Sequence, residues 1–250
     1  MRARLKRWPR PACRSRSDMA VLQRGLRSGL MARAYRKILH SWYLNDIAFD
    51  VRLHAKREAV AYIIEHMQAA MMLRDRFELL RFALARAPAE GLVLEFGVEK
   101  GLSITCLANA TQRVVHGFDS FQGLPDDWSG TAAPRGTFDR QGAPPKVPGN
   151  VQLHIGWFDA TIPQFLAGSD ATISLLHVDC DIYSSTKTIF ALLGPRIVPG
   201  TVIVFDEYFN YPGWRQHEYK AFQEFCAETG RTYRYCGYAG EKGHVAVVMG

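Results

Sequence analysis

Two kinds of hydrophobic periodicity divide the chain. From Glu58 to about Arg86, apolar residues recur at spacings of three and four, which predicts a helix. Its methionines are expected to pack in the core rather than to line a cofactor site. After Pro88, short apolar runs alternate with helical patterns and predict strands over residues 91–97, 113–119, 151–156, 171–179 and 200–206. Two final runs, 232–238 and 244–249, flank a Gly-Glu-Lys-Gly turn and predict a hairpin.

Strands that alternate with helices are typical of an α/β fold. We therefore predict a doubly wound, mostly parallel, seven-stranded sheet of Rossmann-like type, with N-terminal helices and a C-terminal antiparallel hairpin. In such sheets, ligands bind beyond the carboxyl ends of the strands. Residues 120–150, rich in Gly, Pro and Asp, interrupt the alternation. A segment of this length is uncommon in a compact domain unless it is functional, which favours a lid over the site; disorder without function is the alternative.

The net charge of +7 comes from the first part of the chain. Residues 1–37 contain twelve Lys and Arg against one acid, whereas the remainder is acidic overall. We interpret 1–37 as a basic arm that is disordered at least in part, 38–88 as an N-terminal helical segment and 89–250 as the main domain. The basic charge of the arm suits binding to nucleic acid or to an anionic membrane surface. A solvated extension without a binding role is the alternative.

Two further observations bear on the cellular location. No apolar run reaches the ~18–20 residues that a membrane span needs. The five cysteines include no CxxC pair, so we expect reduced thiols rather than disulfides or a zinc site. Together these observations predict a cytoplasmic protein.

A glycine-containing turn follows the first strand of the alternating region. The sequence EFGVEKGLS places Gly97 and Gly101 where the chain turns tightly before a helix whose free N–H groups attract anions. Glu95 is suited to an ammonium group, and Asp119, at the end of the next strand, to the two hydroxyls of a ribose. An amino acid joined to adenosine is the chemistry of S-adenosylmethionine. A turn that is merely structural and a nicotinamide-dependent oxidoreductase are the alternatives, although no GxGxxG is present here.

Acidic residues follow two later strands. Asp179 and Asp181 come after the apolar run 171–179, and Asp206 and Glu207 come at the end of the run 200–206. If these two strands are neighbours, Asp179, Asp206 and Glu207 meet at one edge of the sheet. Carboxylate oxygens are the ligands that Mg²⁺ prefers, and a bound cation lowers the barrier to removing a proton from an alcohol. A magnesium site at this edge is therefore predicted.

The motifs together resemble a known family. The stretches that carry the resemblance are VLEFGVEKGLS, VHGFDSFQGLP, HIGWFDATIPQFL, HVDCDIYSST and GTVIVFDEY. The first resembles the first motif of class I methyltransferases, and the set resembles the macrocin O-methyltransferase family, which methylates sugar hydroxyls. The resemblance implies that the cofactor pocket is lined by Gly97, Glu99, Ser103, Asp119 and Ser120. Asp159 is a candidate for the adenine edge, with helix capping as an equal alternative.

The resemblance also bears on the proton acceptor. The macrocin enzymes have Asp-Asp where this chain has Asp206 and then a glutamate, and the lysine base of catechol-type enzymes is replaced by Ile182. We expect Asp179 or Asp181 to act as the base, although Asp181 is equally suited to cap the helix that follows. His217 is a weaker candidate, and His177 is expected to be a core histidine. The predicted acceptor is a sugar or another small hydroxylated metabolite, and a homodimer joined by the N-terminal helices is plausible.

Overall fold

The computed structural model describes residues 33, 37 and 46–250, so almost all of the basic arm lies outside the described residues. The chain divides into two units, Met1–Asp50 and Val51–Gly250, and the sheet and the site discussed below belong to the second. Among the described residues, no helix is both long and apolar enough to cross a membrane.

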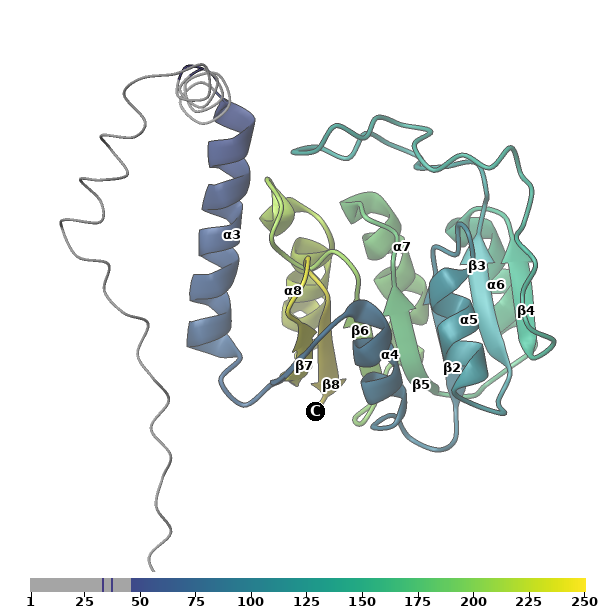
Figure 1. The fold of residues 1–250 in the computed structure, drawn as a ribbon. Helices are drawn as coiled ribbons and strands as arrows, with labels where there is room; N and C mark the ends of the chain where they lie inside the picture. Colours follow the sequence, from purple (N-terminus) through teal and green to yellow (C-terminus); the bar gives the residue numbers. More distant parts are fainter. Residues whose placement is uncertain (1–32, 34–36, 38–45) are drawn as a thin grey trace, which may run out of the picture. The chain divides into compact units, whose positions relative to one another are not determined.

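The second unit is built on an eight-stranded sheet with the order β1-β7-β8-β6-β5-β2-β3-β4 (Figure 1). Only β8 runs antiparallel to its neighbours β6 and β7; the remaining pairs are parallel. The strands are β1 (Met71–Leu73), β2 (Leu92–Phe96), β3 (Val115–Asp119), β4 (Val151–Ile155), β5 (Ile173–Val178), β6 (Val202–Phe205), β7 (Tyr233–Ala239) and β8 (Val245–Met249). This arrangement confirms the predicted α/β fold and its C-terminal hairpin.

The strand order fixes where a ligand binds. From β2 the chain moves to β3 and β4 on one side, then crosses to β5 and β6 on the other. The direction of winding therefore reverses between β2 and β5, and a crevice forms there at the carboxyl ends of the strands. Because β5 and β6 are parallel neighbours, as the sequence interpretation required, their acidic ends lie side by side.

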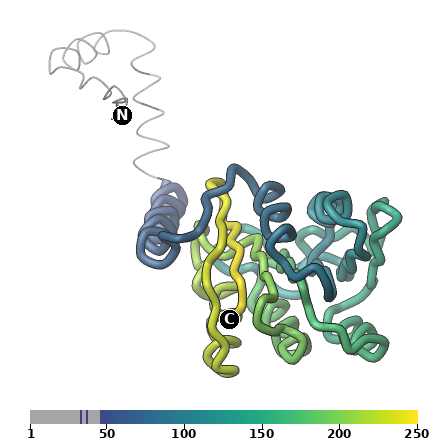
Figure 2. The backbone as a smooth tube through the Cα atoms, turned by 90° about the horizontal axis from the view of Figure 1, so that it is seen from below, coloured from purple at the N-terminus to yellow at the C-terminus, as the bar shows by residue number. Residues whose placement is uncertain are grey.

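Neighbouring residues of a strand point to opposite faces of the sheet, and here both faces are apolar, so helices cover both of them. Leu175 belongs to the core under one layer and Leu176 to the core under the other. In Figure 2, seen from below, the helices coloured blue and teal lie at the top of the view and the green helices at the bottom. The helices are α3 (Ile47–His66), α4 (Arg76–Leu84), α5 (Leu102–Asn109), α6 (Phe158–Leu166), α7 (Tyr183–Leu193) and α8 (Glu218–Thr229), with short 3₁₀ turns η2 (Gly194–Arg196) and η3 (Trp214–Gln216).

The prediction of one long helix over residues 58–86 is wrong. The chain leaves α3 after His66, forms the edge strand β1 and starts again as α4. Asp75 begins α4 by accepting a hydrogen bond from the Glu78 N–H, 2.9 Å away. Met71 and Met72, expected in the core, lie on β1 and are 54% and 68% exposed. The spacing of apolar residues was helical throughout, and the capping aspartate was the signal that the helix is broken.

Candidate active site

A cavity of about 570 Å³ opens at the carboxyl ends of the central strands. Most of the residues predicted for the site line it, namely Gly97, Glu99, Ser103, Asp119, Ser120, Asp159, Asp179, Asp181, Asp206 and Glu207. Glu95 and Gly101 do not line it. The structure therefore brings the glycine turn and the acids, which lie about 80 residues or more apart in the sequence, to the walls of one cavity.

The glycine turn depends on a close approach of two strand ends. Gly97 has a φ of +91°, and a Cβ at this position would overlap the carbonyl oxygen of Asp179. The neighbouring backbone is tied across the same gap, because the Asp179 N–H donates to the carbonyl of Phe96 at 2.8 Å. Glycine is thus required here both by the backbone conformation and by the space available.

Asp119 holds the loops on either side of the cavity. Its Oδ2 accepts hydrogen bonds from the N–H groups of Val98 and Glu99 at 2.8 and 2.9 Å. Its Oδ1 accepts one from the N–H of Phe121 at 2.7 Å. A carboxylate offers about four acceptor positions, so roughly one remains for a ligand. Binding both hydroxyls of a ribose would require one of these backbone bonds to be replaced.

Glu95 faces the interior of the protein rather than the cavity. It is fully buried; Ser103 Oγ donates to its Oε1 at 3.0 Å, and its Oε2 lies 2.8 Å from Nδ1 of His177. Phe96, not Glu95, is the last residue of β2, so the glutamate side chain lies on a face of the sheet. The ammonium contact that the sequence suggested for Glu95 is therefore not available in this structure.

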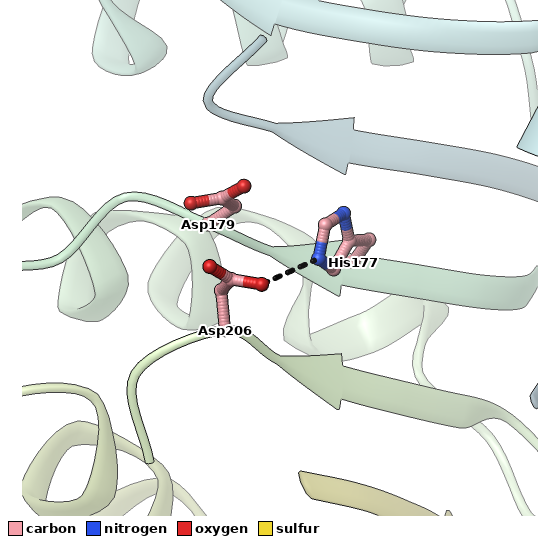
Figure 3. Close-up of side chains that lie close together, drawn as sticks. All are labelled: His177, Asp179 and Asp206. Atoms are coloured by element: carbon pink, nitrogen blue, oxygen red, sulfur yellow. Dashed lines mark ion pairs between the residues drawn. The ribbon is translucent and has the colours of Figure 1, made fainter. Parts of the chain in front are cut away.

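The acids at the ends of β5 and β6 form two groups. Oxygens of Asp179, Asp181 and Glu207 lie within 4.8 Å of one another. Asp179 and Asp206 form a second group with His177, again within 4.8 Å, and Figure 3 shows these three side chains converging. The expected trio of Asp179, Asp206 and Glu207 is thus divided, with Asp179 common to both groups.

Burial and mutual repulsion dominate the first group. Burial, with further contributions from Asp206 and Asp181, raises the pKa of Asp179 well above its usual range, and Glu207 is affected in the same way. Burial raises the pKa of Asp181 to about 7. The Oε2 atom of Glu207 is buried without a hydrogen-bond partner. Three crowded oxygen ligands with one free buried oxygen fit a divalent cation, whose charge would offset the repulsion.

Asp206 has the opposite electrostatics. Burial alone would raise its pKa, but contacts with His244, His177 and Arg76 outweigh burial and lower the pKa below the ordinary value. His244 Nδ1 lies 2.8 Å and His177 Nε2 3.9 Å from its Oδ1, and an Arg76 nitrogen lies 3.5 Å from its Oδ2. Asp206 is therefore ionised at neutral pH and largely compensated by its neighbours.

Glu218, which the sequence did not single out, joins the two acid-bearing loops. It is the first residue of α8 and is fully buried. Its Oε1 accepts from the N–H of Asp181 at 3.2 Å, and its Oε2 from the N–H of Glu207 at 3.1 Å. Asp181 has a φ of +66° and does not cap α7, which begins after Ile182 without a side-chain cap. The capping alternative for Asp181 is therefore wrong.

The segment 120–150 passes over the carboxyl ends of the strands (Figure 1) and contributes to the cavity there. Its residues Leu124, Trp128 and Phe138 contribute to the walls. Two contacts hold the segment to the other side of the cavity. Asp126 accepts a hydrogen bond from Ser184 Oγ at 2.8 Å. His217 Nε2 lies 2.9 Å from the Ser129 carbonyl oxygen, so this histidine holds the lid and does not line the cavity.

Comparison with known proteins gives a consistent result. Residues 94–208 match a family described as a methyltransferase domain. The calicheamicin methyltransferase CalS11 is 21% identical, with 94% of this chain and 93% of that chain covered and a TM-score of 0.55. The O-methyltransferase NovP is 22% identical, with coverages of 69% and 78% and a TM-score of 0.51. A search of curated proteins finds no match. The expected class I methyltransferase fold is confirmed, and the match of residues 94–208 to a methyltransferase domain bears out the expectation of an enzyme.

Proposed function

We propose that this chain, in which residues 94–208 form a methyltransferase domain, is an S-adenosylmethionine-dependent O-methyltransferase assisted by a divalent cation such as Mg²⁺. Its acceptor would be a hydroxyl of a sugar or another small metabolite. The observation that carries the proposal is the single cavity that joins the glycine turn to the acid cluster. The structural similarity to NovP, an O-methyltransferase, supports oxygen as the methylated atom.

The half of the cavity beside β2 and β3 would hold the cofactor. Gly97, Glu99, Ser103 and Ser120 line this half, Asp119 would contact the ribose, and Asp159 would contact the adenine edge. A volume of about 570 Å³ lies within the roughly 300–1,000 Å³ of ordinary ligand pockets. The methyl group of this cofactor is already activated, so the protein has to bind, orient and exclude water rather than create a leaving group.

The half beside β5 and β6 would hold the acceptor hydroxyl. Asp179, which belongs to both acid groups, would hold the cation together with Asp206 or Glu207, and the cation would lower the pKa of an oxygen bound to it. Asp179 or Asp181 would accept the hydroxyl proton. Asp181 fits this role well, because a pKa of about 7 leaves a substantial fraction of the base ready at neutral pH. The braces from Glu218 to the backbone of Asp181 and Glu207 would keep both groups in position.

The acceptor side of the cavity combines aromatic and hydroxyl groups. Trp128 and Phe138 supply aromatic surface, and Ser184, Ser185 and Thr188 supply hydrogen-bonding groups. This combination suits a ring-shaped molecule with several hydroxyls, which presents both apolar and polar faces. Because the basic arm lies almost wholly outside the described residues, its binding to nucleic acid or membrane stays a prediction, as do the cytoplasmic location and the homodimer.

Isothermal titration calorimetry with S-adenosylhomocysteine tests the proposal. Wild-type protein is expected to bind it in the micromolar range and to show no binding of NAD⁺. Asp159→Ala should weaken binding by roughly 2- to 12-fold, the loss of one hydrogen bond. Asp170→Ala is the matched control, because Asp170 is an exposed acid outside the cavity. Failure of the wild-type protein to bind S-adenosylhomocysteine would contradict the proposed function.

A further inference from the structure

His177 has one satisfied and one free ring nitrogen, although the sequence suggested an ordinary core histidine. The residue lies on β5 and is fully buried. Its Nδ1 lies 2.8 Å from Oε2 of Glu95, the residue directly opposite on β2. Its Nε2 is buried and has no hydrogen-bond partner. An orphaned ring nitrogen in a dry interior is costly unless something binds it.

The contact with Glu95 determines which nitrogen is free. A carboxylate accepts hydrogen bonds, so the Nδ1 of His177 carries the proton and Nε2 presents a lone pair. This lone pair faces Oδ1 of Asp206 at 3.9 Å, and a carboxylate oxygen of Asp179 lies within 4.8 Å (Figure 3). The Nε2 lone pair and the oxygens of the two acids thus offer three ligand atoms to one cation.

We propose that His177 is a nitrogen ligand to a divalent metal ion held together with Asp179 and Asp206, and that Glu95 orients its ring. The inference rests on the proposed function for the presence of a cation and adds its identity. Two atoms that bind one ion at about 2.1 Å lie up to roughly 4.2 Å apart, which accommodates the observed 3.9 Å. A histidine whose other nitrogen contacts a carboxylate is a common arrangement at metal sites.

A nitrogen ligand changes the choice of metal. Mg²⁺ takes oxygen ligands almost exclusively, whereas Mn²⁺, Co²⁺ and Zn²⁺ also accept imidazole nitrogen. We therefore infer that this enzyme binds a transition-metal ion such as Mn²⁺ more tightly than Mg²⁺. The positive charge of Arg76 beside Oδ2 of Asp206 weakens metal binding at this carboxylate. His244 Nδ1 lies 2.8 Å from Oδ1, the oxygen that His177 faces, so the metal would use the remaining lone pair of that oxygen.

The main test is the nitrogen coupling of bound Mn²⁺. Full-length protein is stripped with EDTA, loaded with Mn²⁺ and examined by pulsed electron paramagnetic resonance. Imidazole nitrogen coupling is expected in the wild-type protein and is expected to vanish in His177→Asn. Calorimetric titration should give a smaller dissociation constant for Mn²⁺ than for Mg²⁺. This measurement on the wild-type protein decides the question even if a variant fails to fold.

Variants refine the test. His177→Asn should weaken Mn²⁺ binding at least 10-fold, and Glu95→Gln about 10- to 100-fold, as is usual for the partner of a metal-binding histidine. His154→Asn is the matched control, because His154 is a partly buried histidine on β4 that contacts His116 rather than the acids. Its Mn²⁺ affinity should equal that of the wild type.

Several results would overturn the inference. These are Mn²⁺ bound without nitrogen coupling, equal affinities for Mn²⁺ and Mg²⁺, or no binding of divalent metal at all. Titration of S-adenosylhomocysteine into the same samples separates the two proposals. If this ligand binds while the metal test fails, only the metal inference is lost; if it does not bind, the proposed function fails independently.

Discussion

The two hydrogen bonds accepted by Glu218 offer the sharpest test of how the acid-bearing loops are positioned. Glu218→Ala removes both acceptors and leaves the N–H groups of Asp181 and Glu207 without partners in a buried site. Each buried unsatisfied N–H costs about 1–3 kcal/mol, so the loss of unfolding free energy should be about 2–6 kcal/mol. In Glu218→Gln one oxygen remains as an acceptor, and the loss should be smaller.

Relief of charge repulsion does not cancel this loss. Burial, together with Asp181 and Asp206, raises the pKa of Glu218 well above its usual range. Its ionised form is therefore disfavoured, and its removal takes less negative charge out of the cluster than the removal of an exposed glutamate would. The same substitution should also lower methyl transfer more than cofactor binding, because both braced residues lie in the acceptor half of the cavity.

Urea denaturation of the wild type, the two variants and Glu228→Ala measures the effect. Glu228 lies on the same helix, is 63% exposed and forms an ion pair with Lys187, so its removal should cost less than about 1 kcal/mol. The order of stability should be wild type and Glu228→Ala together, then Glu218→Gln, then Glu218→Ala. If the urea midpoint of Glu218→Ala equals that of the wild type, the interpretation that Glu218 braces the two loops is refuted.

Two further predictions concern the glycine turn and acid stability. Gly97→Ala should lower the unfolding free energy by more than about 3 kcal/mol, because its Cβ would overlap Asp179. Gly136→Ala, with a similar φ of +82° but no atom within 4 Å, should cost only about 1 kcal/mol, and equal urea midpoints would contradict this account. Burial and the neighbouring His154 lower the pKa of His116 from 6.5 to about 4. The unfolded chain therefore binds more protons between these values, and stability is lost as the pH falls from 6.5 to 4. In His116→Gln the difference between urea midpoints at pH 7 and pH 5 should shrink; an unchanged difference would oppose this assignment.

The strands were predictable because their signal is local. Five runs of apolar residues after Pro88 gave β2 to β6, and the Gly-Glu-Lys-Gly turn gave the hairpin of β7 and β8. The eighth strand was missed because β1 has only three residues and lies inside a helical pattern of apolar spacing. Its strand conformation comes from pairing with β7, which is distant in the sequence.

The site was predictable only as far as strand ends determine it. Asp179 and Asp206 follow parallel neighbouring strands, so their proximity follows from the fold alone. The contact between Glu95 and His177 depends on the register of β2 against β5, which no local pattern reveals. Glu218 lies at the start of α8 and reads as an ordinary first-turn acid; its role arises from the way α8 packs beneath the two loops.

The place of β8 in the sheet has a consequence for biosynthesis. This strand is the last of the eight to be made, yet it lies between β6 and β7. On the ribosome, β6 therefore has one open edge until β8 emerges, and neither β7 nor β1 can join the sheet before then. His244, which immediately precedes β8, meets Asp206 only at that stage. The acid-lined pocket is thus completed only once β8 has been made, and until then chaperones have access to the edge of β6.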